Sequence, residues 1–224
     1  MRRTTNQSKG ENAMRHLDRS TSHHGRRWLR HGGLLIAMVA MLLTATGGGT
    51  AWAATLFTDN FEDGNAAGWI TTGGTWIVTQ ESSKVLHQSS LAANALARAG
   101  QPGWRDYTVT ADVKPTSFNG FPGFVGVVAR AQSTTTYYAL VLRPNNTAEL
   151  TRTVGGTAST LAVMRVAVSA GTTYTLALRT AGQSLTGWVN GVAVTASDGF
   201  IFAGQAGLVT TWTTASFDNV IVNT

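Results

Sequence analysis

Few residues in this chain of 224 residues have the chemistry that catalysis requires. Cysteine is absent, and His87 is the only histidine after residue 31, which removes Cys/His catalysis and leaves no Ser/His/Asp motif. Glycoside hydrolysis requires two carboxylates that flank one bond, but Glu149 stands alone on its predicted strand and Glu81 has no acidic neighbour within five residues. The sequence therefore favours a binding protein over an enzyme.

A second set of residues has the chemistry of a sugar-binding surface. Sugar rings have apolar C–H faces surrounded by hydroxyl groups, so such a surface combines exposed aromatic planes with planar hydrogen-bonding groups. Tyr137 and Trp188 are the candidate planes. The planar hydrogen-bonding groups are the guanidinium groups of Arg130, Arg143 and Arg179, each of which can donate two parallel hydrogen bonds. Three arginines on one face favour an acidic glycan such as a pectin-like uronan. The alternative is that these arginines are ordinary solvated side chains.

The charge of the chain is distributed unevenly. The net charge is +6, from 17 Lys and Arg against 11 Asp and Glu. The first 30 residues contain eight of the basic residues and two of the acidic ones, so the rest of the chain has no net charge. A nucleic-acid-binding domain needs a basic patch or stripe, and we therefore expect no nucleic-acid partner.

The N-terminal segment has the order of a secretory signal. Its basic region is followed by ten apolar residues, Leu34–Leu43, and then by small residues that end at Ala53. The apolar run is about half as long as the roughly 20 residues of a membrane-spanning helix. We expect residues 1–53 to be cleaved as a signal peptide, which gives a secreted, extracellular chain of residues 54–224 without a stable membrane span.

Two features of this segment leave alternatives open. Arg26 and Arg27 loosely fit a twin-arginine export signal, although paired arginines are common in the basic region of general secretory signals. The basic region is also unusually long, so Met14 is an alternative start of translation.

Residues 54–224 have the pattern of β-strands. They are rich in Thr, Val, Gly and Ala, and apolar and polar residues alternate along nearly every stretch, which places alternate side chains on opposite faces of a strand. The predicted strands are 56–61, 75–80, 85–88, 107–114, 124–131, 137–143, 148–154, 160–168, 173–180, 184–189, 192–196, 204–212 and 215–222. Residues 90–99 are rich in alanine and fit a helix or a loop. The pattern predicts one all-β domain of two packed antiparallel sheets.

Alternation within three strands predicts which side chains form the core. Their apolar positions are Val125, Val127, Ala129, Tyr138, Leu140, Leu142, Tyr174, Leu176 and Leu178. The alternate positions contain Tyr137 and the three candidate arginines, and Trp188 has the same polar parity on the next strand. We therefore expect these five residues on the outward face of one sheet.

Several motifs together resemble a known family of domains. They are Asp59-Asn60-Phe61-Glu62-Asp63-Gly64, Gly68-Trp69, Trp104-Arg105-Asp106-Tyr107-Thr108-Val109, Tyr137-Tyr138-Ala139-Leu140 and Ser216-Phe217-Asp218-Asn219-Val220. The chain resembles the concanavalin A-like jelly-roll domains over residues 56–223. More narrowly, it is similar to the laminin G-like and carbohydrate-binding modules of secreted bacterial polysaccharide-degrading proteins, including some pectate lyases. The resemblance implies two curved sheets, glycan binding and often a structural calcium ion.

The calcium ion that the resemblance implies would join the two ends of the domain. Calcium takes oxygen ligands from carboxylates and carbonyl groups, and Asp59, Glu62 and Asp63 cluster near the start of the domain. In the carbohydrate-binding jelly rolls the Glu of the opening motif and the Asp of the closing motif bind the ion. These correspond to Glu62 and Asp218, with Asp59 as a weaker candidate. Alternatively, the aspartates cap turns and bind loop backbone.

Three functions follow as hypotheses. The first is a secreted, non-catalytic carbohydrate-binding module, with a polysaccharide as its partner and any catalytic protein on a separate chain. The second is a polysaccharide lyase or glycoside hydrolase of concanavalin A-like fold. A lyase needs only a basic residue and a charge-neutralising partner, whereas the Glu-x-Asp-x-x-Glu spacing of the concanavalin A-like glucanases is absent from the sequence. The third is a laminin G-like module for protein interaction or adhesion.

Overall fold

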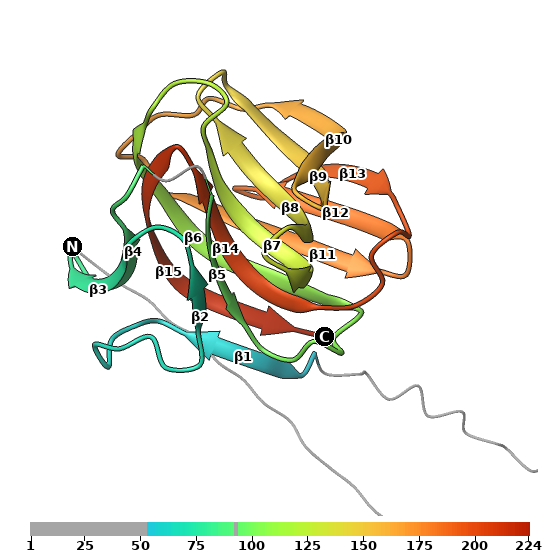
Figure 1. The fold of residues 1–224 in the computed structure, drawn as a ribbon, viewed down its shortest axis with the longest axis horizontal. Helices are drawn as coiled ribbons and strands as arrows, with labels where there is room; N and C mark the ends of the chain where they lie inside the picture. The colour runs from blue at the N-terminus through green and yellow to red at the C-terminus, as the bar shows by residue number, and fades with distance from the viewer. Residues whose placement is uncertain (1–52, 92–93) are drawn as a thin grey trace, which may run out of the picture. The chain divides into compact units, whose positions relative to one another are not determined.

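The computed structural model describes residues 53–91 and 94–224, which form fifteen strands and no helix. The two sheets, here named A and B, are antiparallel throughout and lie face to face (Figure 1). Sheet A has the order β13 (Val192–Ser197), β12 (Ser184–Val189), β11 (Tyr174–Ala181), β6 (Tyr107–Phe118), β15 (Thr213–Asn223), β4 (Lys84–Gln88) and β3 (Trp76–Gln80), and β1 (Thr55–Asp59) pairs with β15. Sheet B has the order β10 (Thr157–Arg165), β9 (Thr147–Val154), β8 (Thr136–Arg143), β7 (Phe124–Ser133), β14 (Gln205–Thr211), β5 (Ala95–Ala99) and β2 (Ile70–Thr72).

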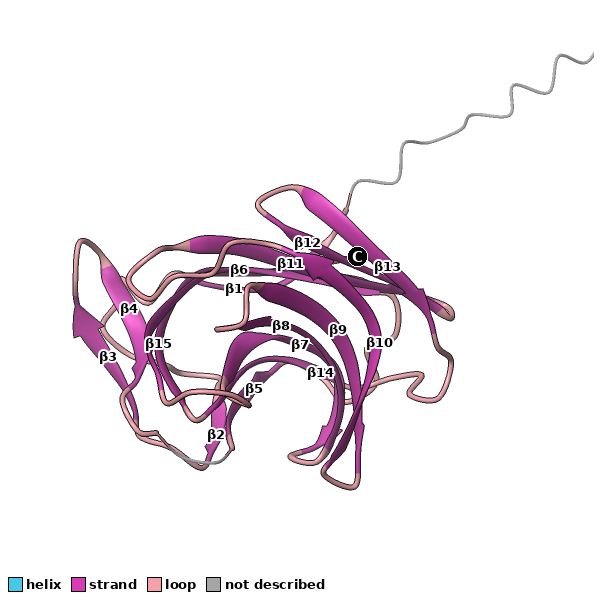
Figure 2. Ribbon diagram, turned by 90° about the horizontal axis from the view of Figure 1, so that it is seen from above, coloured by secondary structure: helices cyan, strands magenta, loops and turns pink. Residues whose placement is uncertain are grey.

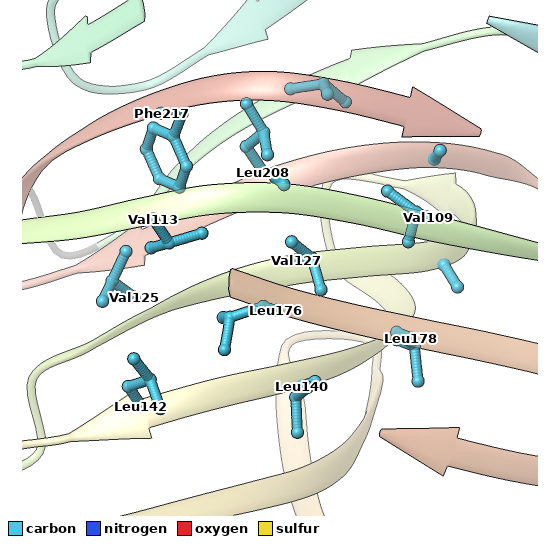
Figure 3. Close-up of a cluster of buried hydrophobic side chains, with 14 of the residues drawn as sticks. Val109, Val113, Val125, Val127, Leu140, Leu142, Leu176, Leu178, Leu208 and Phe217 are labelled. Atoms are coloured by element: carbon cyan, nitrogen blue, oxygen red, sulfur yellow. The ribbon is translucent and has the colours of Figure 1, made fainter. Parts of the chain in front are cut away.

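The all-β, two-sheet prediction is confirmed. The nine apolar positions predicted for the core are all buried between the sheets. Figure 3 shows how side chains from both sheets meet there, with Val127 and Leu140 of sheet B near Leu176 and Leu178 of sheet A. Because the side chains of a strand alternate, these residues also determine which positions point away from the core.

Two strands differ from the prediction. Residues 95–99 form β5, not a helix or loop, and pair with β14 through Ala97 and Leu208. Small alanine side chains at 95, 97 and 99 are buried on one side of β5, and Leu96 is buried on the other. A short strand that packs on both sides lacks the polar alternation by which strands are recognised in a sequence. The three-residue strand β2 was also not predicted.

The five candidate sugar-binding residues do not share one sheet, so that prediction is wrong. Arg130, Tyr137 and Arg143 lie on β7 and β8 of sheet B, whereas Arg179 and Trp188 lie on β11 and β12 of sheet A. β11 pairs with β6 and β12, and it faces β7 and β8 across the core. Alternation correctly assigned Tyr137, Arg143, Arg179 and Trp188 to the side away from the core, but these residues lie on two different sheets.

Sheet B carries a second apolar cluster on the side away from the core. Figure 2 shows this sheet as a deep arch nested below sheet A. The buried residues of this cluster are Leu96, Val128, Ala131, Tyr137, Ala139, Val141 and Val209. The strong curvature brings side chains of neighbouring strands together on the concave side. Positions that alternation predicts to be solvent-exposed are therefore buried.

The predicted signal peptide lies outside the described residues, apart from its last residue. No helix in residues 53–91 and 94–224 is long and apolar enough to cross a membrane.

Candidate functional site

A hollow of about 350 Å³ lies on the outward side of sheet A and contains two of the candidate residues, Arg179 and Trp188. Thr186, the register partner of Arg179, is two residues before Trp188 on β12, so the two side chains are diagonal neighbours on one face. Thr108 on β6 and Asp106, just before that strand, also contribute polar groups to the lining. An indole, a guanidinium, a hydroxyl and a carboxylate thus converge on one surface.

Small residues on the neighbouring strands leave room beside Trp188. Its register partners are Ala177 on β11 and Ala193 on β13. A methyl group on each side covers little of an indole ring, and Trp188 is accordingly only half-buried. Arg179 is exposed. A flat aromatic plane flanked by a forked donor is the combination that a sugar ring with its apolar face and hydroxyl groups requires.

Asp106 is held in place at the rim of this hollow. Its Oδ1 accepts a hydrogen bond from the backbone N–H of Gly182 at 2.7 Å and from Nη2 of Arg130 at 3.1 Å. All the hydrogen bonds that Asp106 makes to the described residues use Oδ1. The carboxylate is mostly exposed, with a side-chain exposure of 64%. It is thus a fixed acceptor for a ligand hydroxyl. Asp106 was not among the predicted site residues, although it belongs to the Trp104–Val109 motif.

Arg130 is buried, and its side chain binds other parts of the protein. It is 1% exposed, and its guanidinium donates to the carbonyl oxygens of Arg105 at 2.8 Å and Ile201 at 2.9 Å, as well as to Asp106. It lies at a bulge of β7 with a φ of 51°, and this break in the register directs its side chain to the end of the sandwich. We expected Arg130 to lie exposed on a sheet face and to bind a glycan there. The structure contradicts this expectation, because the side chain is buried.

Tyr137 and Arg143 lie in the arch of sheet B. Tyr137 is 4% exposed, and burial raises the pKa of its hydroxyl. Arg143 forms a salt bridge from Nε to Glu149 Oε2 at 2.8 Å and donates from Nη1 to the Pro122 carbonyl at 2.9 Å. Its guanidinium also lies 5.0 Å from the ring centre of Phe124. The ring of Tyr137 is therefore not open for a sugar to stack on it, and the guanidinium of Arg143 is already bonded to protein groups.

A second, more polar hollow of about 260 Å³ lies elsewhere on the outward side of sheet A. Here Lys114 Nζ forms a salt bridge with Glu81 Oε2 at 2.7 Å. The hydrogen bonds from Lys114 and Ser216 hold the pKa of Glu81 below its ordinary value. Asp112 and Asp218 are register partners in this hollow, and each carboxylate accepts hydrogen bonds from the protein. The hollow is polar, but Lys114 and Glu81 pair with each other, and both aspartates are bonded to neutral groups of the protein.

The three carboxylates predicted to bind calcium each have protein partners. Asp59 accepts from the Phe61 N–H and from Nε1 of Trp69, both at 2.8 Å. Glu62 Oε1 accepts from the Lys84 N–H at 3.0 Å, and Asp218 accepts from Ser83 and the Asn219 N–H. Among the described residues no three His, Cys, Asp or Glu side chains form a group that could hold a metal ion. Calcium binding therefore stays a prediction from the resemblance.

Comparison with known proteins adds one related sequence. No model of a protein family matches the chain. The chain is 31% identical over 141 residues to an extracellular exo-α-L-arabinofuranosidase of Streptomyces chartreusis. The match covers 62% of this chain but only 16% of that enzyme. The similarity is thus confined to a small part of the larger protein.

Solved structures with the same fold include a carbohydrate-binding module, a domain of an arabinanase and a glucanase. The carbohydrate-binding module CBM66 from Bacillus subtilis has a TM-score of 0.63 at 22% identity, over 71% of this chain and 98% of that one. Domain 4 of an extracellular arabinanase from Geobacillus stearothermophilus, in complex with arabinotriose, has a TM-score of 0.55 at 14% identity, over 76% and 92%. A Bacillus licheniformis β-glucanase has a TM-score of 0.55 at 13% identity, over 78% and 99%. The chain has the concanavalin A-like jelly-roll fold.

Proposed function

We propose that residues 54–224 bind carbohydrate without catalysis, through the hollow at Trp188. The observation that carries this proposal is the convergence of the half-exposed Trp188 ring with Arg179 and Asp106 on one face of sheet A. A sugar ring stacked on the indole would place its hydroxyl groups within reach of a donor and an acceptor. The similarity to a carbohydrate-binding module and to part of an arabinofuranosidase supports the same function.

The ligand that we propose to test first is an arabinose-containing polysaccharide. The related sequence belongs to an arabinofuranosidase, and one structural neighbour was solved with arabinotriose. The case for an acidic glycan is weaker than the sequence indicated, because Arg130 and Arg143 are buried and only Arg179 remains at the hollow. A guanidinium that lines the same hollow as a carboxylate is suited to hydroxyl groups at least as well as to uronic acids. Polygalacturonate is therefore the second ligand in the test.

The test is a titration of residues 54–224 with arabinan and with polygalacturonate by calorimetry. We expect Trp188→Ala and Arg179→Ala to reduce arabinan affinity, Trp188→Ala by about tenfold or more, which corresponds to the loss of about 1.4 kcal/mol. Trp212→Ala is the matched control, because Trp212 is also partly exposed but does not line the hollow. If the parent binds neither polysaccharide, or if Trp188→Ala binds like the parent, the proposed function is wrong.

Two further measurements separate this function from the alternatives. A lyase produces unsaturated uronides that absorb ultraviolet light, so steady growth of absorbance with polygalacturonate would establish catalysis. A laminin G-like protein-interaction module would give no hits on a glycan array. Secretion is part of the proposal as well: the protein purified from the culture medium should begin at Ala54, as N-terminal sequencing can determine.

A further inference from the structure

The loop between β13 and β14, residues 198–204, presents two phenylalanines to solvent. Phe200 is 63% exposed and Phe202 is 60% exposed, whereas Ile201 between them is completely buried. Ile201 packs in the core between the sheets. The buried Ile201 thus anchors the loop between two aromatic rings that face the solvent. Exposure of two neighbouring aromatic rings to water is thermodynamically unfavourable. Exposed apolar surface that is clustered in this way is typical of a binding site.

Buried side chains hold this loop in one conformation. The Tyr138 hydroxyl accepts a hydrogen bond from the Ile201 N–H at 3.0 Å and donates to Asp198. Arg130 Nη1 donates to the Ile201 carbonyl oxygen at 2.9 Å. Asp198 in turn accepts from the Phe200 N–H at 2.9 Å. Both backbone groups of Ile201 are therefore bonded to side chains of sheet B. A ligand that stacks on the two rings would not have to order the loop.

Each phenylalanine lies beside a guanidinium. The Arg152 guanidinium is 5.0 Å from the ring centre of Phe200, and that of Arg105 is 5.5 Å from the ring centre of Phe202. These distances are within the range of a cation–π interaction. Arg152 Nη1 also donates to Asp198 Oδ2 at 2.6 Å, which fixes this guanidinium beside Phe200, and the exposed Arg105 adds a hydrogen-bond donor next to Phe202. The loop thus repeats the combination of aromatic plane and guanidinium found at Trp188 and Arg179.

The loop is linked to the hollow at Trp188 through shared residues. Arg105, beside Phe202, directly precedes Asp106 at the rim of that hollow. The Arg105 carbonyl oxygen accepts from Thr180 Oγ1 at 2.8 Å, and Thr180 also lines the hollow. Arg130 bridges the two places, because it bonds to Asp106 as well as to Ile201. An extended ligand that leaves the hollow past Asp106 would reach Arg105 and then Phe202.

We propose that Phe200 and Phe202, with Arg152 and Arg105, form a second carbohydrate subsite. This subsite binds further sugar residues of the same chain whose first residues stack on Trp188. The inference rests on the proposed function and adds that affinity depends on the length of the oligosaccharide. A protein partner docked on the two rings is the competing explanation, and it predicts no such dependence.

The test compares short and long arabino-oligosaccharides by calorimetry. The variants are Phe200→Ala/Phe202→Ala, Trp188→Ala and the control Phe121→Ala. Phe121 is a matched control because it is 69% exposed and also lies beside an arginine, 5.6 Å from the Arg143 guanidinium, but on the loop between β6 and β7. All the substituted rings are at least partly exposed, and thermal melting checks that each variant is folded.

We expect the parent to bind long oligosaccharides more tightly than short ones. The Phe200→Ala/Phe202→Ala variant should bind the short ligand like the parent and bind the long ligand about tenfold more weakly. Phe121→Ala should bind both like the parent. Unchanged affinity of the double variant for long ligands overturns the subsite and leaves the proposed function standing. A parent that binds neither these oligosaccharides nor polygalacturonate overturns both the subsite and the proposed function.

Discussion

The guanidinium of Arg130 on β7 donates from Nη1 to the Ile201 carbonyl oxygen at 2.9 Å, inside the sandwich. This bond links sheet B to the loop between β13 and β14. The same side chain reaches the rim of the Trp188 hollow through Asp106. One buried arginine thus supports both of the surfaces that we propose to bind sugar. Its role is to position other residues, and a ligand does not touch it.

Replacement of Arg130 should destabilise the protein, whereas replacement of Arg179 should not. Arg130→Met removes hydrogen bonds to two carbonyl oxygens and a carboxylate, and we expect the free energy of unfolding to fall by about 3 kcal/mol. Arg179 is exposed, so Arg179→Met should change it by less than about 0.5 kcal/mol. Denaturant unfolding of both variants is the measurement. Equal effects would contradict the structural role assigned to Arg130.

A larger side chain at position 177 should block the hollow at Trp188 without removing any binding residue. Ala177 is the register partner of Trp188 on β11 and points away from the core. In Ala177→Leu the added branched chain would cover part of the indole plane and reduce carbohydrate affinity, while the melting temperature stays close to that of the parent. The control is Ala158→Leu on exposed β10 of the other sheet. Parent-like affinity of Ala177→Leu would show that sugars do not stack there.

Acid should weaken the loop between β13 and β14 through Asp198. Burial raises the pKa of this carboxyl, but the hydrogen bonds from Tyr138 and the Phe200 N–H, together with Arg152, outweigh it and hold the pKa below its ordinary value. A lowered folded-state pKa contributes stability above the unfolded-state pKa of about 3.9, and this contribution is lost as the pH falls through the folded-state value.

The variant Asp198→Asn tests this dependence. It should melt at a lower temperature than the parent near neutral pH, and the difference should shrink below about pH 4 as the parent's carboxylate becomes protonated. Asp63→Asn is the control, since Asp63 is exposed and bonds only within its own turn. Melting curves across this pH range are the measurement, and a constant difference between Asp198→Asn and the parent would refute the assignment.

The resemblance to calcium-binding jelly rolls makes a separate prediction. The ligands that the resemblance implies are the carboxylate oxygens of Glu62, which follows β1, and of Asp218 on β15, with Asp59 as a weaker candidate. Calcium bound to these oxygens would tie β1 to β15. On this hypothesis the melting temperature rises when calcium is added to chelator-treated protein, and Glu62→Gln abolishes the rise. An identical melting temperature with calcium and with chelator would exclude the ion.

The strands and the core could be predicted because they depend on local alternation. The positions of Val127, Leu140 and Leu176 in the core follow from a period of two within each strand. Alternation does not specify which sheet a strand joins, because that depends on pairing between distant segments. For this reason Trp188 and Arg143 were predicted for one face, although β12 and β8 belong to different sheets.

The positions of the other site residues could not be predicted from the sequence, because they depend on the curvature of sheet B and on the conformation of a loop. Val141 and Tyr137 are outward by alternation but buried by the arch of sheet B, and the depth of an arch is a property of the whole sheet. Phe200 and Phe202 flank a buried Ile201 in a loop that the sequence pattern does not define. The only signal for them is the run of four apolar residues at 200–203, which resembles part of a buried strand.

The second apolar cluster of sheet B has a practical consequence for orienting the molecule on a solid support. β7 and β8 have buried side chains on both sides, whereas Lys114, one of the amines in residues 54–224, lies at a hollow on the outward side of sheet A. Coupling through Lys114 would therefore attach the protein by sheet A, the sheet that also carries the Trp188 hollow. A single cysteine introduced at Ala158 on β10 would be the only thiol in the chain and would leave the Trp188 surface facing the solution.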